Sequence, residues 1–390
     1  MNKRPQDDSI AAHLKRSGVN RRDFLAFCGK LAVVAPFGMS IAGRLTPEAM
    51  AAELGAMKRP SVIWLHLQEC TGCTETLIRT SEPDLADLIF NVISLDYHET
   101  VMAAAGKDAE AALQAAMKAN DGKFICVVEG AVPTKNDGTF LYVAGKKGTD
   151  LLREVTSRAA AVVAIGSCAS WGGVASAGSN PTGAAGIGEL VKNKPVVNIP
   201  GCPPNPYTFL AVALQVAKTG KPPALDALGR PKFAYDRLIH DHCPRRPHFD
   251  AGRFAKNFGD EGHQQGWCLY RLGCKGPVTH APCSTRHFNE ITDAWPIGIG
   301  HPCFGCTEKS IGYTLPLFSL APINDAVPTA MYPPVETSRG MLAATATGTA
   351  GLVGGVLLGA GYVASRKFSN TPGDESIPSD SDEDGKGAAS

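Results

Sequence analysis

The chain has 390 residues, a formal net charge of +1 and 19% charged residues. This length allows two domains with additional segments, and the balanced charge argues against nucleic-acid binding, which requires a clustered basic face. The 12 cysteines are the unusual feature of the composition. They indicate disulfides if the protein is exported, and metal sites or free thiols if it is cytosolic.

Segment 1–51 has the features of a twin-arginine signal peptide. Arg21 and Arg22 precede an apolar run over 31–42, and a small-x-small pattern follows at 49–51. The twin-arginine route exports folded proteins that already carry their cofactors. Metal clusters are therefore compatible with export, and the compartment does not force disulfides. The alternative interpretation is a basic amphipathic helix of the mature protein.

Short apolar runs alternate with helical stretches between residues 58 and 225. The runs lie at 61–67, 124–128, 161–165 and 195–199, and the helical stretches at 109–119 and 150–158. Strands that alternate with helices predict an α/β fold with a parallel sheet.

Four cysteines directly follow predicted strands. Cys70 and Cys73 follow the first run, Cys168 the third and Cys202 the fourth. Ligands of parallel α/β sheets bind at the carboxyl ends of the strands, so we expect these thiols to converge. Four thiolates suit a [4Fe–4S] cluster or a structural zinc ion. Cys126 lies inside a predicted strand and is expected to be a core residue.

Segment 226–325 has weak periodicity and is dense in His, Pro, Gly and Cys, which predicts a loop-rich domain stabilised by cross-links. Its candidate ligands are His240, Cys243, Cys268, Cys274, Cys283, Cys303 and Cys306. Without Cys126, and without Cys28 of the signal, the chain offers eleven candidates. That number fits two four-ligand clusters and one three-ligand cluster, and it fits four-ligand zinc sites poorly. His242 competes with His240, and a histidine ligand favours a cluster near the surface.

Residues 341–364 carry no charge and are long enough to span a bilayer as a helix. Arg366 and Lys367 follow this segment, which places the C-terminal end in the cytoplasm. The alternative is a flexible linker rich in Gly, Ala and Thr. Residues 365–390 are predicted to form an acidic, disordered cytoplasmic tail.

Six motifs resemble those of the small subunit of membrane-bound, periplasmic-facing nickel–iron hydrogenases. They are QECTGCTE at 68–75, VEGAVP at 128–133, GSCA at 166–169, PGCPP at 200–204, HDHCPRR at 240–246 and HPCFGC at 301–306. The resemblance covers essentially all of 58–325, and both termini match the membrane-bound members.

The resemblance implies a flavodoxin-like domain over 58–225, a cluster domain over 226–325 and three iron–sulfur clusters. The implied ligands are Cys70, Cys73, Cys168 and Cys202 for a proximal [4Fe–4S] cluster; His240, Cys243, Cys268 and Cys274 for a distal [4Fe–4S] cluster; and Cys283, Cys303 and Cys306 for a medial [3Fe–4S] cluster. Pro296 is the candidate for the place of a fourth medial ligand. The nickel–iron centre belongs to the large subunit, so this chain is expected to hold no catalytic residue.

The implied function is an electron relay. Electrons from H2 oxidation in the large subunit pass through the three clusters to a membrane acceptor, such as a b-type cytochrome or another electron-transfer protein. The expected location is the periplasmic side of the inner membrane. Glu75 is a candidate for proton transfer, although a surface or capping role is the simpler interpretation. Oxygen-tolerant relatives carry two additional cysteines where this chain has Gly72 and Gly173, which predicts an oxygen-sensitive enzyme.

Two other functions compete with the relay. A cluster-bearing subunit of a quinone oxidoreductase would share the α/β domain, but it leaves the cysteines of 226–325 and the export signal unexplained. A non-enzymatic exported protein built on disulfides or zinc would leave the strand-end cysteines and His240 unexplained.

Overall fold

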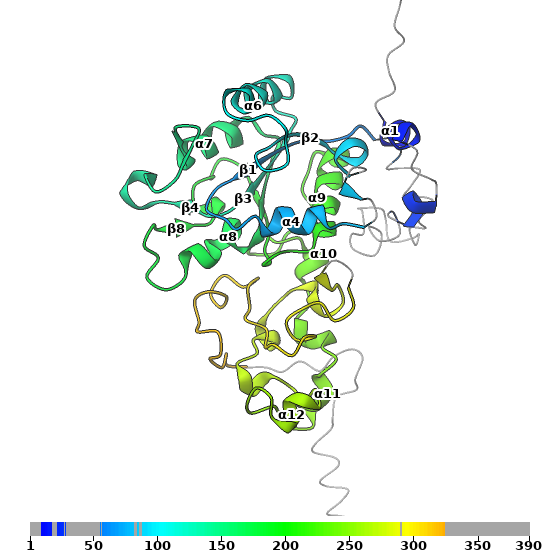
Figure 1. The fold of residues 1–390 in the computed structure, drawn as a ribbon, viewed down its shortest axis with the longest axis vertical. Helices are drawn as coiled ribbons and strands as arrows, with labels where there is room; N and C mark the ends of the chain where they lie inside the picture. Colours follow the sequence, from blue (N-terminus) through cyan, green and yellow to red (C-terminus); the bar gives the residue numbers. More distant parts are fainter. Residues whose placement is uncertain are drawn as a thin grey trace, which may run out of the picture. The chain divides into compact units, whose positions relative to one another are not determined.

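The computed structural model describes residues 9–17, 22–26, 28, 55, 57–81, 84–85, 88–288 and 291–323 (Figure 1). Much of the predicted signal peptide, the predicted membrane helix at 341–364 and the predicted tail at 365–390 lie outside the described residues. Within the described ranges, no helix is both long enough and apolar enough to cross a membrane.

The centre of the fold is a five-stranded parallel sheet. Its strands, in spatial order, are β2 (Ser94–His98), β1 (Ser61–His66), β3 (Ile125–Glu129), β7 (Ala161–Ile165) and β9 (Val196–Ile199). Counted along the chain, this order is 2-1-3-4-5, which is the order of flavodoxin-like folds. The predicted α/β class is therefore confirmed.

Helices cover both faces of the sheet (Figure 1). Val62 and Trp64 of β1 pack in the same core as helix α9 (Pro206–Thr219). Ile63 and Leu65 point to the opposite face, where α6 (Lys107–Ala119) and α7 (Gly148–Arg158) contribute to a second core. The alternation follows from the two-residue period of a strand.

Helix α9 is apolar on nearly all sides, with ten buried residues. Its start is defined by Asn205, whose side chain accepts a hydrogen bond from the N–H of Tyr207 at 3.0 Å. Pro206 occupies the first turn, and Gly220 ends the helix in a left-handed conformation. This helix follows the loop that carries Cys202, so its fixed start also fixes that loop.

The remaining elements of the first part are short. They are α1 (Ile10–Ser17), α4 (Gly72–Ile78), α8 (Gly166–Trp171), a π-helical turn (Leu88–Val92), the antiparallel pairs β4 (Val132–Pro133) with β8 (Ala184–Ala185) and β5 (Tyr142–Val143) with β6 (Lys146–Lys147), and the 3₁₀ turns Lys135–Gly138, Gly173–Ser176 and Ile187–Glu189. Ile10, Leu14 and Cys28 pack in the core that contains α9.

Beyond residue 226 the described chain contains only short helices and isolated bridges. These helices are α10 (Lys232–Tyr235), α11 (Arg246–Asp250), α12 (Glu261–Gln264) and the 3₁₀ turns Ile239–His242, Tyr270–Leu272, Gly276–Val278 and Pro282–Ser284. A third core lies here, and Cys243, Cys274 and Cys303 are buried within it. The part is loop-rich, as the weak periodicity predicted.

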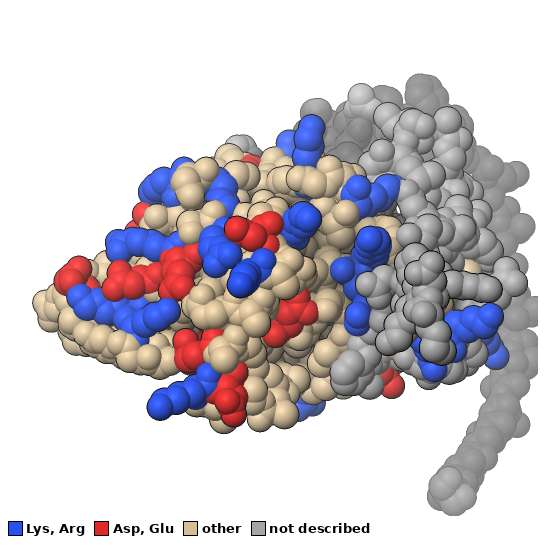
Figure 2. Space-filling model, turned by 90° about the horizontal axis from the view of Figure 1, so that it is seen from above, with Lys and Arg blue, Asp and Glu red and all other residues tan. Residues whose placement is uncertain are grey.

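Charged side chains of both signs are intermixed on the face seen in Figure 2. On α7, Arg158 pairs with Asp121 at 3.0 Å and Glu154 pairs with Lys146 at 2.9 Å. Exposed pairs of this kind contribute little stability. The visible face therefore presents no extended surface of one charge.

Candidate metal centres

The proximal set consists of Cys70, Cys73, Cys168 and Cys202, which lie on the loops and short helices that follow β1, β7 and β9. Burial raises the pKa of Cys73 well above its ordinary value, and negative charge on Glu129 and on the other three thiols raises it further. Such electrostatic effects require short separations. The structure thus brings the four thiols together at one edge of the sheet.

Two glycines lie so close to these thiols that any side chain on them would overlap a sulfur atom. A Cβ atom on Gly166 would be 2.4 Å from Sγ of Cys73, and Gly166 has a φ of +83°. A Cβ atom on Gly173 would be 2.7 Å from Sγ of Cys168. Any side chain at these positions would therefore displace a sulfur atom or the backbone.

Glu129, at the end of β3, anchors the first turn of α4, which carries Cys73. Its Oε1 accepts hydrogen bonds from the backbone N–H groups of Cys73 at 3.0 Å and Thr74 at 3.3 Å. Its Oε2 accepts from the Thr74 hydroxyl at 2.6 Å and from the Trp64 indole at 3.1 Å. In the sequence Glu129 is visible only as a motif residue, because its partners are distant along the chain.

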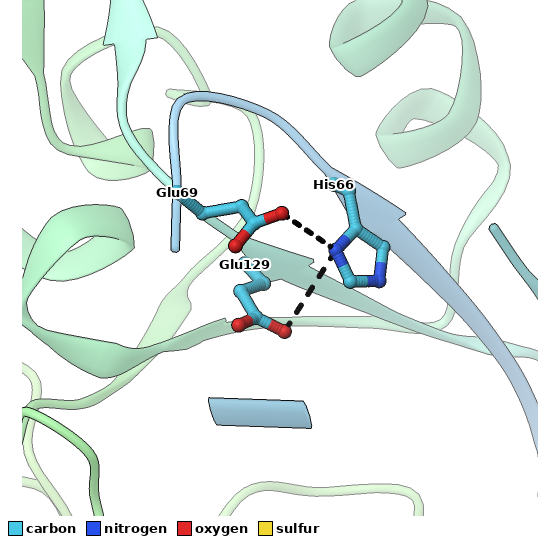
Figure 3. A group of neighbouring side chains, drawn as sticks. All are labelled: His66, Glu69 and Glu129. Carbon is cyan, nitrogen blue, oxygen red and sulfur yellow. Dashed lines mark hydrogen bonds and ion pairs between the residues drawn. The ribbon is translucent and has the colours of Figure 1, made fainter. Parts of the chain in front are cut away.

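His66, Glu69 and Glu129 form a further cluster (Figure 3). Nδ1 of His66 lies 3.2 Å from Oε1 of Glu69 and 4.0 Å from Oε2 of Glu129, and ligand atoms of the three residues lie within 4.8 Å of one another. That spacing suits a cation. Both oxygens of Glu129 already accept two hydrogen bonds each, however, so the cluster supports the 66–74 loop by hydrogen bonding.

The distal set, His240, Cys243, Cys268 and Cys274, lines a single cavity. Burial is the main cause that raises the pKa of Cys268 to about 12 and that of Cys243 to about 11. Burial also lowers the pKa of His240 to about 4, so the imidazole is neutral. Its Nε2 is buried and has no hydrogen-bond partner among the described residues. An unpaired imidazole nitrogen beside three thiols fits a metal cluster.

The competing histidine lies elsewhere. His242 is half-buried, and its Nε2 is 3.4 Å from Nη1 of Arg237, in a different cavity. The geometry favours His240. The distal side chains are buried, whereas Cys70 and Cys202 of the proximal set are exposed. The expectation that the histidine marks a cluster near the surface stays a prediction, because the proximal cysteines are exposed on the edge that the large subunit is expected to cover.

The medial set, Cys283, Cys303 and Cys306, lines another cavity, which Pro296 also lines. Burial, followed by the negative charge of Cys303, raises the pKa of Cys283 to about 12. Cys202 of the proximal set lies at the same cavity. Proline has no side-chain donor atom, so Pro296 offers no fourth ligand to the medial set. The three thiols of the medial set suit a cluster with three cysteine ligands.

The medial set lies next to both of the others. Negative charge on Cys202 helps to raise the pKa of Cys306, after burial and Cys283, and the backbone N–H of Cys303 is 3.4 Å from Sγ of Cys274. Ser167 joins the proximal and the medial set. Its hydroxyl donates to the carbonyl of Cys306 at 2.7 Å and accepts from the N–H of Gly201, the residue before Cys202, at 3.1 Å. The three sets form a series, with the medial set between the proximal and the distal set.

All twelve cysteines lie in the described part of the chain, and none forms a disulfide. Cys126 is fully buried within β3, as expected. Burial raises the pKa of most candidate thiols, and metal ligation requires thiolates. A bound metal cluster supplies the positive charge that makes buried thiolates favourable, so the residues present fit iron–sulfur clusters.

Two family models match the chain. Residues 70–216 match the family of the NADH ubiquinone oxidoreductase 20 Kd subunit, and residues 235–319 match the C-terminal family of NiFe/NiFeSe hydrogenase small subunits. The first match explains why a quinone oxidoreductase subunit is a reasonable alternative for the α/β part. The second match lies on the segment that this alternative leaves unexplained.

The chain is similar to hydrogenase small subunits over most of its length. It is 48% identical over 340 residues to the Hydrogenase-2 small chain of Escherichia coli, covering 87% of this chain and 90% of that protein. It is 47% identical over 297 residues to the periplasmic [NiFe] hydrogenase small subunit 1 of Nitratidesulfovibrio vulgaris, covering 76% and 91%. The structure of the [NiFeSe] hydrogenase from Desulfovibrio vulgaris matches with a TM-score of 0.59 and 36% identity, covering 65% of this chain and 94% of that chain.

Proposed function

Since the chain belongs to the small-subunit family of nickel–iron hydrogenases, which are electron-transfer subunits with iron–sulfur clusters, we propose that its three ligand sets form one electron relay. The chain acts with a hydrogenase large subunit. The nickel–iron centre, where H2 is oxidised, resides in that partner. The role of this chain is to conduct electrons away from it.

The proposed cofactors are two [4Fe–4S] clusters and one [3Fe–4S] cluster. The proximal set would hold a [4Fe–4S] cluster within the flavodoxin-like domain, residues 58–225. The distal set would hold the second [4Fe–4S] cluster, and the medial set the [3Fe–4S] cluster, within residues 226–325. When bound, these clusters supply one-electron redox chemistry, and their potentials depend on ligands, hydrogen bonds and solvent exposure.

The series of thiols carries this proposal. Negative charge on Cys202 raises the pKa of Cys306, and the N–H of Cys303 contacts Sγ of Cys274, so neighbouring sets lie close together. A metal site with a purely structural role would not require further ligand sets arranged beside it in a series. The exposed cysteines of the proximal set mark the end of the series that remains open to the large subunit.

Export and anchoring are proposed from the two terminal segments. Residues 1–51 would direct the folded subunit through the twin-arginine pathway, and 341–364 would anchor it as a transmembrane helix with 365–390 in the cytoplasm. The subunit would then lie on the periplasmic side of the inner membrane, next to a b-type cytochrome or another electron-transfer protein. The similarity to a periplasmic hydrogenase subunit supports the periplasmic side.

Oxygen sensitivity follows from the glycines that adjoin the proximal thiols. A Cβ atom on Gly72 would lie 3.2 Å from Sγ of Cys70, and one on Gly173 would lie 2.7 Å from Sγ of Cys168. Neither position supplies an additional sulfur ligand. We expect H2 oxidation by the complex to stop under air, and sustained turnover in air would contradict this expectation.

Metal analysis of the separated subunit tests the relay. The membrane-extracted complex would be purified anaerobically, its subunits separated under native conditions, and iron, zinc and nickel counted per chain. We expect about eleven irons in this chain, little zinc, and nickel only in the partner. Zinc in place of iron would refute the electron relay.

A further inference from the structure

Lys275 is the most unusual charged residue in the described part of the chain. It follows Cys274 directly and is 0% exposed. Burial of an ammonium group is unfavourable unless an opposite charge compensates for it. Within the described residues, no carboxylate lies at ion-pair distance from Lys275, in contrast to Arg230 and Arg246, which are also buried but have carboxylate partners. Its charge must therefore be balanced by another group.

The hydrogen bonds of Lys275 favour the charged form. Its Nζ donates to the carbonyl oxygens of Leu317 at 2.8 Å, Pro316 at 3.0 Å and Gly273 at 3.4 Å. An ammonium has three N–H donors, which match three carbonyl acceptors. A neutral amine has two, and its lone pair would face the third oxygen. The site is therefore built for a positive charge.

Lys275 also lies at the junction between the distal and the medial set. Its backbone N–H donates to the carbonyl of Cys303 at 2.7 Å, while the N–H of Cys303 is 3.4 Å from Sγ of Cys274. Lys275 is thus joined to one cysteine of each set, to Cys274 along the chain and to Cys303 by this hydrogen bond.

We propose that Lys275 is the shared counter-charge of the distal and medial clusters and that its ammonium raises the reduction potentials of both. The proposal rests on the cluster assignment given above. Reduction adds a negative charge to a cluster, and a fixed positive charge in a medium of low dielectric favours the reduced form. One residue between two adjacent clusters would raise both potentials together and leave the driving force for electron transfer between them little changed.

The test measures cluster potentials in the complete heterodimer. Lys275→Gln retains two N–H donors for the carbonyl oxygens but removes the charge, and Lys275→Met is a second neutral variant of similar length. Lys275→Arg retains the charge. Lys256→Met is the matched control, because Lys256 is an exposed lysine of the same loop-rich part, where solvent screens its charge. Redox titration followed by electron paramagnetic resonance would report the medial and distal potentials, with iron counted in parallel.

We expect Lys275→Gln to disfavour reduction of both clusters at least tenfold, a negative shift of about 59 mV for a one-electron couple. Lys275→Arg should restore much of this shift, and Lys256→Met should have little effect. If the neutral variants lose distal and medial iron while Lys275→Arg keeps it, the charge is needed to hold the clusters, which also supports the proposal.

Three results would overturn the proposal. The first is full iron content in Lys275→Gln with both potentials as in Lys256→Met, and the second is a shift confined to one cluster. The third is loss of iron in Lys275→Arg as severe as in the neutral variants, since that would indicate a role in packing alone. Absence of a [3Fe–4S] signal in the wild-type heterodimer would instead refute the cluster assignment and not the role of Lys275.

Discussion

Single residues around the proximal thiols determine whether four sulfur atoms fit at one sheet edge. Gly166 provides room for Sγ of Cys73, and Glu129 orients the helical turn that carries the same cysteine. Glu75, two residues beyond Cys73, is exposed and paired with Arg79, which agrees with a surface role and gives no support to proton transfer. Neither Gly166 nor Glu129 has a ligand atom directed to the site, so their effects are steric and structural.

Gly166→Ala tests the steric effect. The new methyl group would lie 2.4 Å from Sγ of Cys73, so we expect loss of the proximal cluster, about four irons per chain. Gly178→Ala is the control, because Gly178 also has a positive φ, of +64°, but a methyl group there would meet no atom within 4 Å. A side chain at a positive φ costs roughly 1–2 kcal/mol, and this cost is the same for both variants. Equal iron content in the two proteins would contradict this explanation.

Glu129→Gln tests the structural effect. The amide replaces an acceptor oxygen by a donor that faces other donors, so we expect a loss of about 1–3 kcal/mol of stability. Thermal unfolding of the complex at a fixed scan rate would measure it. Glu75→Gln, on helix α4 to which Glu129 bonds, should cost less than about 0.5 kcal/mol, because its partner Arg79 is exposed. Similar unfolding temperatures for the two variants would show that the four hydrogen bonds contribute little.

The apolar pattern of each helix and strand explains whether the sequence predicted it. The strands β1, β3, β7 and β9 are short, mainly apolar runs, and the cysteines after three of them were predicted to converge. Strand β2 was not predicted, because Ser94 and Asp96 interrupt its apolar pattern at the sheet edge, where they bond to each other at 2.6 Å. Helix α9 was not predicted either, since a helix that is apolar on all sides shows no helical period.

A buried ion pair connects the segment after α9 to the loop after Cys306. Nη1 of Arg230 donates to Oε1 of Glu308 at 2.8 Å and to the carbonyl of Thr307 at 3.0 Å, while its Nε donates to Asp226 at 2.7 Å. Burial alone would raise the pKa of Glu308, but hydrogen bonds from His280 and Arg230 outweigh this and lower it. The pair therefore connects the last cysteine motif to the beginning of the loop-rich part.

Arg230→Met leaves Glu308 buried without its cation, and we expect a cost of about 3–5 kcal/mol. The double variant Arg230→Met/Glu308→Gln should lose less than the sum of its single variants. Because the pKa of Glu308 is lowered from 4.5, the coupling should be complete above that pH and disappear as the pH falls through the lowered value. Arg79→Met, which breaks an exposed pair, is the control. Additive losses would contradict the coupling.

Across the whole molecule, the sets differ in exposure. Cys70 and Cys202 are exposed, whereas the three distal cysteines are buried. The grouping of ligands in 226–325 was not readable from spacing, because this part lacks regular elements and its contacts join distant residues. Only the family resemblance separated the distal from the medial set. Ser167 and Lys275 were missed for the same reason, since their partners lie far along the chain.

The difference in exposure predicts the order of iron loss. In the separated subunit, a chelator should remove proximal iron first and distal iron last, because access limits the reaction. Spectroscopy of the three clusters during chelation would follow this order. In the intact complex, only the loss of proximal iron should be slower, if the large subunit covers the sheet edge that carries the proximal set. Distal loss before proximal loss would contradict the prediction.

The contact between Cys303 and Cys274 also has a consequence for biosynthesis. The proximal ligands are all present once residue 202 has left the ribosome, the distal ligands at residue 274 and the medial ligands at residue 306. At translation rates of about 5–20 residues per second, the last step follows the first by roughly 5–20 s. Because the N–H of Cys303 lies against Sγ of Cys274, the final loop closes over a distal site that was completed earlier. The centre of the relay is therefore the last part to be synthesised, and iron loaded at the distal site beforehand would be enclosed by it.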